Sequence, residues 1–344
     1  MTTIKDVAAV ARVSPASVTR VLRGYPYVSD DLRSRVMEAV EACDYRPNLL
    51  ASSLRIGQTH VVGLVLSTIT NVTLAVIVDS LQQELAAGEF GVIVSSSHGD
   101  PSADVRGVER LIQRRVDALI LVPQDETQPA LLAALDRLTV PVLALDRELH
   151  VPEMSSILTD HFGGMVTLLQ HLVDQGHHRI GLISTSARTF PGRERIRAFE
   201  HVAATSPISG DAELVRQVAF SESAGAEALG ALCDLHDPPT AIVLGGSMLL
   251  VGAFREARCR NIEVGRDLAI AAGDDWPFMS LFEPGITALS RDLEDLGRRA
   301  ASMVLDLLSP DGSPPTSVVF PMQLIVRAST GTWRSPAPST SPSH

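Results

Sequence analysis

A short run near the N-terminus carries a side chain that suits the reading of a DNA base. On a helix that buries Val18 and Val21, Arg20 lies on the opposite, exposed side. A guanidinium placed there can donate to O6 and N7 of one guanine together, the most common specific contact to a base. The residues before it add hydroxyls suited to phosphates and small apolar groups suited to a thymine methyl. These flanking residues are Ser17, Thr19, Pro15 and Ala16.

Three short helices are expected to position this run. Hydrophobic spacing predicts helices over 4–11 and 15–22, and Ser29 is a candidate cap for a third helix. Ser14 is a candidate N-cap of the second helix, because Pro15 suits the first helical position. Two short helices joined by a three-residue turn have the spacing of a helix-turn-helix, whose second helix enters the major groove. A three-helix bundle that only caps another domain is the alternative that this spacing leaves open.

From His60 onward, short β-rich runs alternate with amphipathic segments of helical length. This alternation predicts a doubly wound α/β architecture with parallel strands. The number of strands is too large for one such sheet at this length, so we expect two lobes. The strands are expected over 61–66, 91–97, 118–123, 140–146, 155–160, 179–184, 214–220, 241–246, 268–274, 285–291 and 317–327.

Charge is unevenly distributed along the chain, which has a net charge of −11. The first 59 residues hold 8 Lys and Arg against 6 Asp and Glu, whereas the remainder holds 21 against 34. Phosphate repels an acidic body, so only the weakly basic N-terminal segment is expected to touch DNA. Because that segment is so weakly basic, we expect two copies of it to act together.

Several classes of protein are disfavoured by what the sequence lacks. There is no secretory signal and no apolar stretch of about 18 residues, so we expect a soluble, cytoplasmic protein with no membrane partner. The three widely spaced cysteines, Cys43, Cys233 and Cys259, predict neither a disulfide framework nor a zinc site. No GxGxxG after the first strand, P-loop, GxSxG or metal-ligand cluster is present. We therefore expect no enzyme, no cofactor and no metal.

The order of motifs resembles that of the LacI/GalR family of bacterial transcriptional regulators. In the N-terminal segment the resemblance rests on Thr3–Ala8, Val13–Leu22, Val28–Ser29 and Tyr45–Asn48. It continues through Gly63–Val65, Arg114–Asp117, Asp146–Arg147, Gly176–Ile180, Gly273–Asp275 and Leu324–Thr330. One departure is Thr19, where the family usually has Ser, and both residues carry a hydroxyl.

The resemblance implies an α/β fold with a three-helix helix-turn-helix head, a hinge helix and a two-lobed doubly wound domain like that of periplasmic binding proteins. The expected segments are the DNA-binding head over 1–47, the hinge helix and linker over 48–59, the effector-binding and dimerisation domain over 60–332 and a disordered tail over 333–344. The N-lobe is expected over about 60–160 plus 288–317, and the C-lobe over about 161–287 plus 318–332.

The segment after the head implies a second contact with DNA. By the resemblance, residues 48–55 form a helix that folds on DNA beside its twin from a second subunit. Leu54 then wedges into the minor groove and bends the duplex, with Arg55 following. Paired wedges imply a homodimer on a pseudo-palindromic operator. The alternative is that Leu54 only packs between domains. The expected DNA contacts are Thr3, Lys5, Ser14, Pro15, Ala16, Ser17, Thr19, Arg20, Asn48, Ala51, Leu54 and Arg55.

The resemblance also implies a cleft for a small polar effector, such as a sugar or nucleoside. The residues that match effector positions are Thr73 and Leu74 in the first loop, Arg195 as the anchor, Phe220 as the stacking aromatic and Asp274 as the acid. Arg195 as a surface partner of Glu194, Phe220 as core and Asp274 as a turn cap remain open alternatives. Residues 245–247 are Gly-Gly-Ser where the family commonly has Ala-Asn-Asp, so an altered effector site is expected.

The predicted function is that of a sequence-specific transcriptional regulator, with repression as the commoner outcome in the family. A solute-binding protein is disfavoured by the head and by the missing signal. An architectural DNA-bending protein with a vestigial ligand lobe stays open, and so do the operator, the effector and the sign of the response.

Overall fold

The computed structural model describes residues 2–22, 24–45, 58–310, 312 and 314–331. The chain divides into two compact units, Met1–Thr59 and His60–His344, and each is described by itself. None of the described helices is long and apolar enough to cross a membrane.

The N-terminal unit is built from three helices, α1 (Ile4–Ala11), α2 (Pro15–Leu22) and α3 (Asp30–Ala42). Side-chain caps set where these helices begin. The Oγ of Ser14 accepts from Ser17 N at 3.1 Å, and the Oγ of Ser29 accepts from Leu32 N. The helices predicted over 4–11 and 15–22 are confirmed. Their apolar faces meet in one core made of Val7, Ala8, Ala11, Val18, Val21, Val36 and Ala39.

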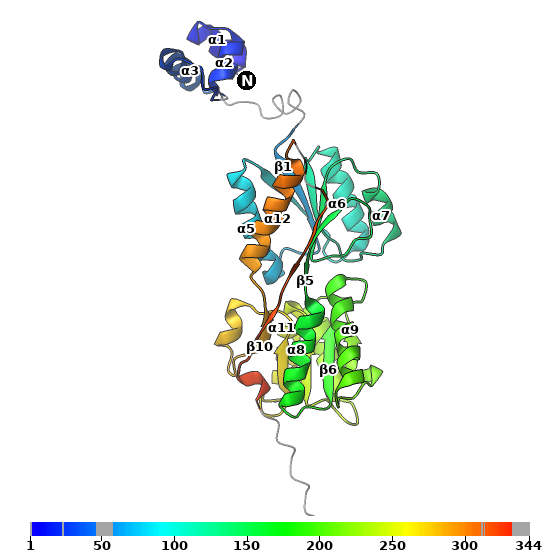
Figure 1. The fold of residues 1–344 in the computed structure, drawn as a ribbon. Coiled ribbons are helices and arrows are strands. Elements are labelled where there is room, and N and C mark those ends of the chain that lie inside the picture. The colour runs from blue at the N-terminus through cyan, green and yellow to red at the C-terminus, as the bar shows by residue number, and fades with distance from the viewer. Residues whose placement is uncertain (1, 23, 46–57, 311, 313, 332–344) are drawn as a thin grey trace, which may run out of the picture. The chain divides into compact units, whose positions relative to one another are not determined.

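The second unit contains two six-stranded sheets with helices on both faces, which we call the N-lobe and the C-lobe (Figure 1). The N-lobe sheet is wholly parallel, in the order β11-β5-β4-β3-β1-β2. Its strands are β1 (Val61–Leu66), β2 (Gly91–Ser96), β3 (Ala118–Val122), β4 (Val142–Leu145), β5 (Ser155–Thr159) and β11 (Ser317–Phe320). Its helices are α5 (Val72–Ala87), α6 (Pro101–Gln113), α7 (Pro129–Leu135) and α12 (Leu293–Leu308).

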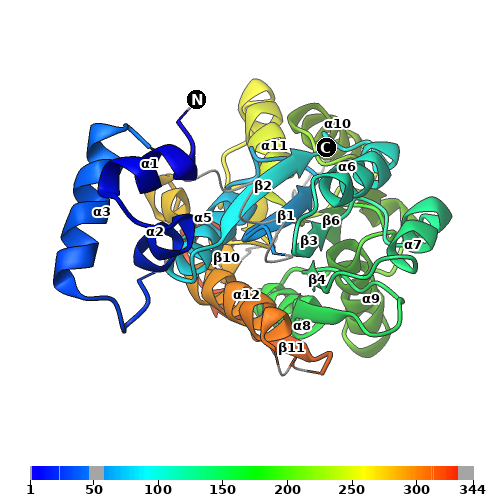
Figure 2. The ribbon, with the colours of Figure 1, turned by 90° about the horizontal axis from the view of Figure 1, so that it is seen from above.

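Alternate side chains of the N-lobe strands face two different helix layers. Leu64 packs with α5 and α12, whereas its neighbour Val65 packs with α6 and α7. These two pairs of helices cover opposite faces of the sheet (Figures 1 and 2). Strands covered on both faces are apolar throughout, and this is why the predicted runs show no alternation of polar residues.

The C-lobe sheet has the order β12-β10-β9-β8-β6-β7 and is parallel except for β12, which pairs antiparallel with β10. Its strands are β6 (Ile180–Ser184), β7 (Val215–Gln217), β8 (Ala241–Leu244), β9 (Ala269–Ala272), β10 (Thr287–Ser290) and β12 (Gln323–Ile325). Its helices are α8 (His161–Asp174), α9 (Phe190–Thr205), α10 (Glu222–Cys233) and α11 (Ser247–Cys259). Three short 3-10 turns, η1 (Ala212–Leu214), η2 (Pro277–Leu281) and η3 (Ala328–Thr330), complete it.

The chain crosses between the lobes three times, after β5, after β10 and after β11. The second and third crossings come later than the predicted positions, 288 and 318. β10 belongs to the C-lobe sheet and β11 to the N-lobe sheet, so each crossing follows its strand. The run 317–327 was expected to be one strand and is two, in different sheets. Pro321 separates them, because proline has no N–H to continue a ladder.

Two glycines let α10 and α11 pack with their backbones in close contact. A Cβ added at Gly252 would overlap the carbonyl oxygen of Glu222, and one at Gly225 would overlap the backbone of Leu249. Both obstacles are backbone atoms, so neither contact can be relieved by a side-chain rotation. These glycines therefore set the spacing of the two helices behind the C-lobe sheet.

We expect Gly252→Ala to lower the free energy of unfolding by about 1–3 kcal/mol, the usual effect of overfilling a packed site. Urea denaturation followed by circular dichroism measures the change. Gly210→Ala is the matched control, since a Cβ there meets only Ala203 at an ordinary 3.5 Å. The control is expected to change stability by less than about 0.5 kcal/mol. Equal stability of the two variants would contradict the close packing of α10 on α11.

Candidate nucleic-acid interface and ligand pocket

The N-terminal end of α2 presents the side chains that the sequence analysis singled out. Arg20 is exposed while Val18 and Val21 are buried, as the helical spacing predicted. Ser14, Pro15 and Ala16 are exposed at the tip, and Ser17 and Thr19 are half-buried. This end of the helix can therefore approach a groove without unfolding the core of the head.

The hydroxyls of this helix already make local hydrogen bonds. Ser14 and Ser17 join their hydroxyls at 2.9 Å, and Thr19 donates to the carbonyl of Pro15 at 3.0 Å. Phosphate oxygens are acceptors, so Thr19 has to turn its hydroxyl away from Pro15 before it can donate to one.

The other predicted DNA contacts fall into two groups. Thr3 and Lys5 are exposed at the start of α1, where Thr3 donates its N–H and hydroxyl to the carboxylate of Asp6 at 2.7 and 2.8 Å. These bonds lower the pKa of Asp6. Asn48, Ala51, Leu54 and Arg55 lie outside the described residues.

A pocket of about 80 Å³ lies between the two lobes, where strand ends and helix N-termini meet. All five residues predicted for the effector line it. The polar and charged residues of the lining are Ser67, Asn71, Thr73, Gln124, Asp146, Arg147, Thr185, Thr189, Arg195, Asp274 and Arg291. Leu74, Val122, Pro191, Phe220 and Gly245 complete it.

The structure changes the expected setting of Thr73 and Leu74. Both residues were expected in a loop, but they lie in the first turn of α5. Asn71 caps that helix, its side-chain oxygen accepting from Thr73 N at 3.1 Å, which starts the helix earlier than expected. A rigid helix therefore presents these two side chains to the pocket.

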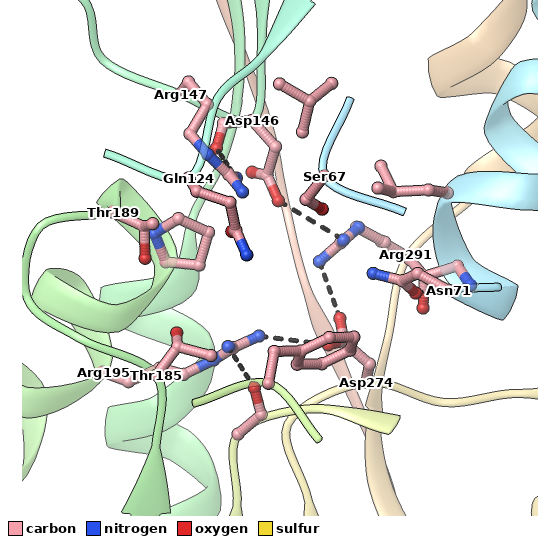
Figure 3. Close-up of a pocket in the computed structure, with 16 residues that line it drawn as sticks. Ser67, Asn71, Gln124, Asp146, Arg147, Thr185, Thr189, Arg195, Asp274 and Arg291 are labelled. Carbon is pink, nitrogen blue, oxygen red and sulfur yellow. Dashed lines mark hydrogen bonds and ion pairs between the residues drawn. The ribbon is translucent and has the colours of Figure 1, made fainter. Parts of the chain in front are cut away.

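A chain of buried ion pairs crosses the pocket (Figure 3). Arg195 on α9 pairs with Asp274, which follows β9, with Nη2 3.1 Å from Oδ2. Asp274 also pairs with Arg291 at 3.0 Å, and Arg291 reaches Asp146 at the end of β4 at 3.5 Å. His161 then contacts Asp146 at 3.0 Å. This series of ion pairs joins the C-lobe to the N-lobe through Arg291, which lies on the second crossing.

These contacts remove one of the alternatives for Arg195. Arg195 as a whole residue is only 4% exposed, and the neighbouring Glu194 forms its ion pair with Arg197 instead. Arg195 is therefore no surface ion pair. Phe220 is half-buried and packs against the C-lobe core while it lines the pocket, so for this residue both interpretations hold in part.

Burial and charge together set the protonation of the central pair. Burial by itself raises the pKa of Asp146, but His161 and Arg291 outweigh it and hold that pKa well below its usual range. Burial lowers the pKa of His161. Asp146 is therefore ionised at neutral pH, and His161 Nε2 lies 3.0 Å from both of its carboxylate oxygens.

The rim of the pocket is closed by contacts between the lobes. Glu126, in the loop after β3, accepts from Phe190 N at the start of α9 at 2.5 Å and lies 3.5 Å from Arg193. Asp125 pairs with Arg188 at 2.9 Å. Burial raises the pKa of Glu126, although Arg147 and Arg193 oppose this effect. A carboxylate at the N-terminus of α9 is also favoured by the helix dipole.

Glycines at 245 and 246 have a steric explanation. A Cβ at Gly246 would lie 2.6 Å from the ring of Phe220, and one at Gly245 would lie 2.9 Å from the Oγ of Ser184 and 3.3 Å from the Cδ of Arg195. Larger residues at these positions would displace Phe220 and Arg195 from the pocket. The two glycines of the altered triplet at 245–247 therefore leave the space that Phe220 and Arg195 occupy.

Of the polar and charged residues of the pocket, the sequence predicted Thr73, Arg195 and Asp274 as effector contacts but not the others, which include Gln124, Arg147 and Arg291. Arg291 follows β10 directly, as Asp146 follows β4, and Asp274 lies two residues beyond the end of β9. A charged residue at the carboxyl end of an apolar strand is the signal that could have found it. Among the described residues, no group of three or more His, Cys, Asp or Glu is arranged to hold a metal ion.

Comparisons with known proteins agree with this architecture. Residues 3–48 match the model of bacterial regulatory proteins of the lacI family, and residues 169–330 match the periplasmic binding protein-like domain. The HTH-type transcriptional repressor PurR of Mannheimia succiniciproducens is 24% identical, over 96% of this chain and 98% of that protein. The ribose operon repressor of Haemophilus influenzae is 24% identical over 93% and 96%.

A solved structure extends the likeness to the whole fold. The structure of the lac repressor dimer bound to operator and the anti-inducer ONPF has a TM-score of 0.84 and 26% identity, covering 96% of this chain and 99% of that one. The matches extend along nearly the full length of the chain. They agree with the helix-turn-helix head and the two-lobed α/β domain in indicating one family. The chain is a member of the lacI family of bacterial regulatory proteins.

Proposed function

We propose that this regulator represses transcription by binding a pseudo-palindromic operator as a homodimer, and that a small polar effector in the interlobe pocket controls the binding. The observation that carries the proposal is the exposed end of α2, where Arg20 faces outward from a helix anchored by buried Val18 and Val21. Such a helix can offer its N-terminal half to the major groove. Operator DNA lies in the bacterial cytoplasm, so we propose that the protein acts there.

Dimer formation is supported by the low charge of the head and by the relatives. A head with a net charge of about +2 has little nonspecific attraction for phosphate, so two heads on one site strengthen binding. The lac repressor neighbour binds its operator as a dimer. A twofold axis in the protein then requires a twofold axis in the operator.

Effector control is supported by the pocket and its contacts with both lobes. The ion-pair chain from Arg195 to Asp146 contains groups from the C-lobe, the N-lobe and the second crossing. A ligand that competes for one of these partners changes the contacts that join the lobes. Control follows only if the ligand binds two arrangements of the lobes with different affinity.

Selection of bound sequences from random DNA tests the proposal directly. We expect the full chain to recover two inverted half-sites. Arg20→Ala should then lose about 1–3 kcal/mol of binding free energy, because a bidentate contact to guanine is removed. Fluorescence anisotropy on operators substituted at single base pairs measures both the loss and its position.

Arg35→Ala is the matched control for this variant, since Arg35 is an exposed arginine of α3 that pairs with Asp31. Both variants lose one positive charge. Only Arg20→Ala is expected to relax the preference at one base pair in each half-site. A uniform loss over all sequences in the Arg20 variant would assign that residue to phosphate rather than to a base.

The proposed wedge gives a separate prediction, based on the family resemblance alone. We expect Leu54→Ala to reduce operator affinity and DNA bending together, because no apolar side chain remains to unstack a base step. Gel mobility of circularly permuted operator fragments reports the bend. Unchanged affinity together with unchanged bending would show that Leu54 is no wedge.

A further inference from the structure

The side chain of Arg291 is buried but poorly bonded. It is 5% exposed and lines the interlobe pocket, from the crossing that follows β10. Its only hydrogen bond among the described residues is a long one, 3.5 Å from Nη2 to Asp146. Nη1 lies 3.0 Å from a carboxylate oxygen of Asp274 without hydrogen-bond geometry, and Nε has no partner among the described residues.

Its neighbour Arg147 shows what a satisfied buried arginine looks like in this pocket. Arg147 donates to the carbonyls of Pro123 and Asp146, each at 2.7 Å, and lies 3.6 Å from Glu126. A buried donor without an acceptor costs free energy, and a charged donor costs more than a neutral one. Arg291 therefore has unused capacity to bind an acceptor.

The carboxylates beside Arg291 are shared with other donors. Asp146 accepts from Thr159 N at 3.2 Å and contacts His161 at 3.0 Å. Asp274 also accepts a hydrogen bond from Arg195, whose own Nε is buried without a partner among the described residues. Among the four groups Arg195, Asp274, Arg291 and Asp146, it is thus the guanidiniums that retain buried atoms without a hydrogen-bond partner among the described residues. A ligand that supplies acceptor oxygens complements this pocket better than one that supplies only donors.

Helix N-termini add to this preference. Asn71 and Thr189 are the N-caps of α5 and α9, and Gly245 directly precedes the N-cap of α11. All three residues line the pocket. Each of these helices directs the positive end of its dipole toward the site, which favours an anion over a neutral molecule.

The arginines at the rim of the pocket do not add to this preference for an anion, because their guanidinium groups already pair with carboxylates. Arg188 and Arg193 face three carboxylates, those of Asp125, Glu126 and Glu148. The anion must therefore bind inside the rim, against Arg291. A volume of about 80 Å³ has room for roughly half a dozen water-sized groups, so the ligand is small.

We propose that the effector is a small metabolite bearing an oxyanion, a carboxylate or a phosphate ester, and that Arg291 is the residue that selects it. This inference rests on the proposed function, since it names the chemical class of the ligand in the same pocket. The anion accepts from the unbonded edge of Arg291 and competes with Asp146 and Asp274 for that guanidinium.

Three probes with one carbon skeleton test the class of ligand, namely glycerol, glycerate and glycerol 3-phosphate. Isothermal titration calorimetry and thermal unfolding of the full chain report binding. We expect one or both anions to bind and to raise the Tm, and glycerol to do neither. The comparison of glycerate with glycerol 3-phosphate decides between carboxylate and phosphate. Binding of glycerol as tight as that of either anion, or no binding of either anion, would overturn the proposal.

Arg291→Gln tests the residue itself. We expect it to weaken binding of the anion by at least about tenfold, the effect of losing a charged hydrogen bond. Arg291→Lys keeps the charge without the planar fork and should keep a weakened preference for the anion over glycerol, so it remains informative if the Gln variant does not fold. Arg298→Gln is the matched control, since Arg298 is an exposed arginine of α12 that pairs with Glu294 and Asp295.

Unchanged anion affinity in Arg291→Gln, or equal losses in the Arg291 and Arg298 variants, would also overturn the proposal. Binding of the same preparations to DNA recovered by selection is measured separately. Loss of anion recognition with DNA binding intact contradicts only the ligand class. Absence of specific DNA binding contradicts the proposed function instead.

Discussion

One buried guanidinium contacts carboxylates of both lobes, and the arrangement of the pocket depends on it. Arg291 lies between Asp146 of the N-lobe and Asp274 of the C-lobe (Figure 3). In a buried site such charges interact far more strongly than in water, but they also lose their hydration. Removing one member leaves the others buried without a partner, so the groups act as a unit. A substitution of Arg291 therefore alters ion pairs in both lobes.

The fold explains why these residues meet. Each sheet is almost wholly parallel, so its strands end on one edge, and polar residues follow the strands there. Asp146 and Arg291 come directly after β4 and β10, and Asp274 comes two residues after the end of β9. The three crossings bring the two edges opposite each other. Because Arg291 lies on a crossing, its side chain takes part in the connection between lobes as well as in the pocket.

Small residues complete the arrangement where larger ones would obstruct it. The glycines at 245 and 246 leave room for Arg195 and Phe220, and Gly252 lets α11 approach α10. The head uses a different device, in which hydroxyl and carboxylate caps define the start of short helices around a small apolar core. In both units, the course of the backbone determines where the polar side chains lie.

The sequence by itself determined the helices of the head, the alternation of strands and helices, and the five residues that line the pocket from the positions matched by the resemblance. Local spacing and caps are enough for the helices and strands, because they depend on neighbours within a few residues, whereas the five pocket residues came from the resemblance. Tertiary structure alone decided which lobe β10 and β11 join, since a strand finds its sheet through partners far away in the chain. It also decided that Arg195 bonds to Asp274 rather than to Glu194 beside it, and that Arg291 lies in the pocket. Such contacts join residues from different strands and different lobes, so the place of Arg291 after a strand can mark it as a candidate but cannot give its partners.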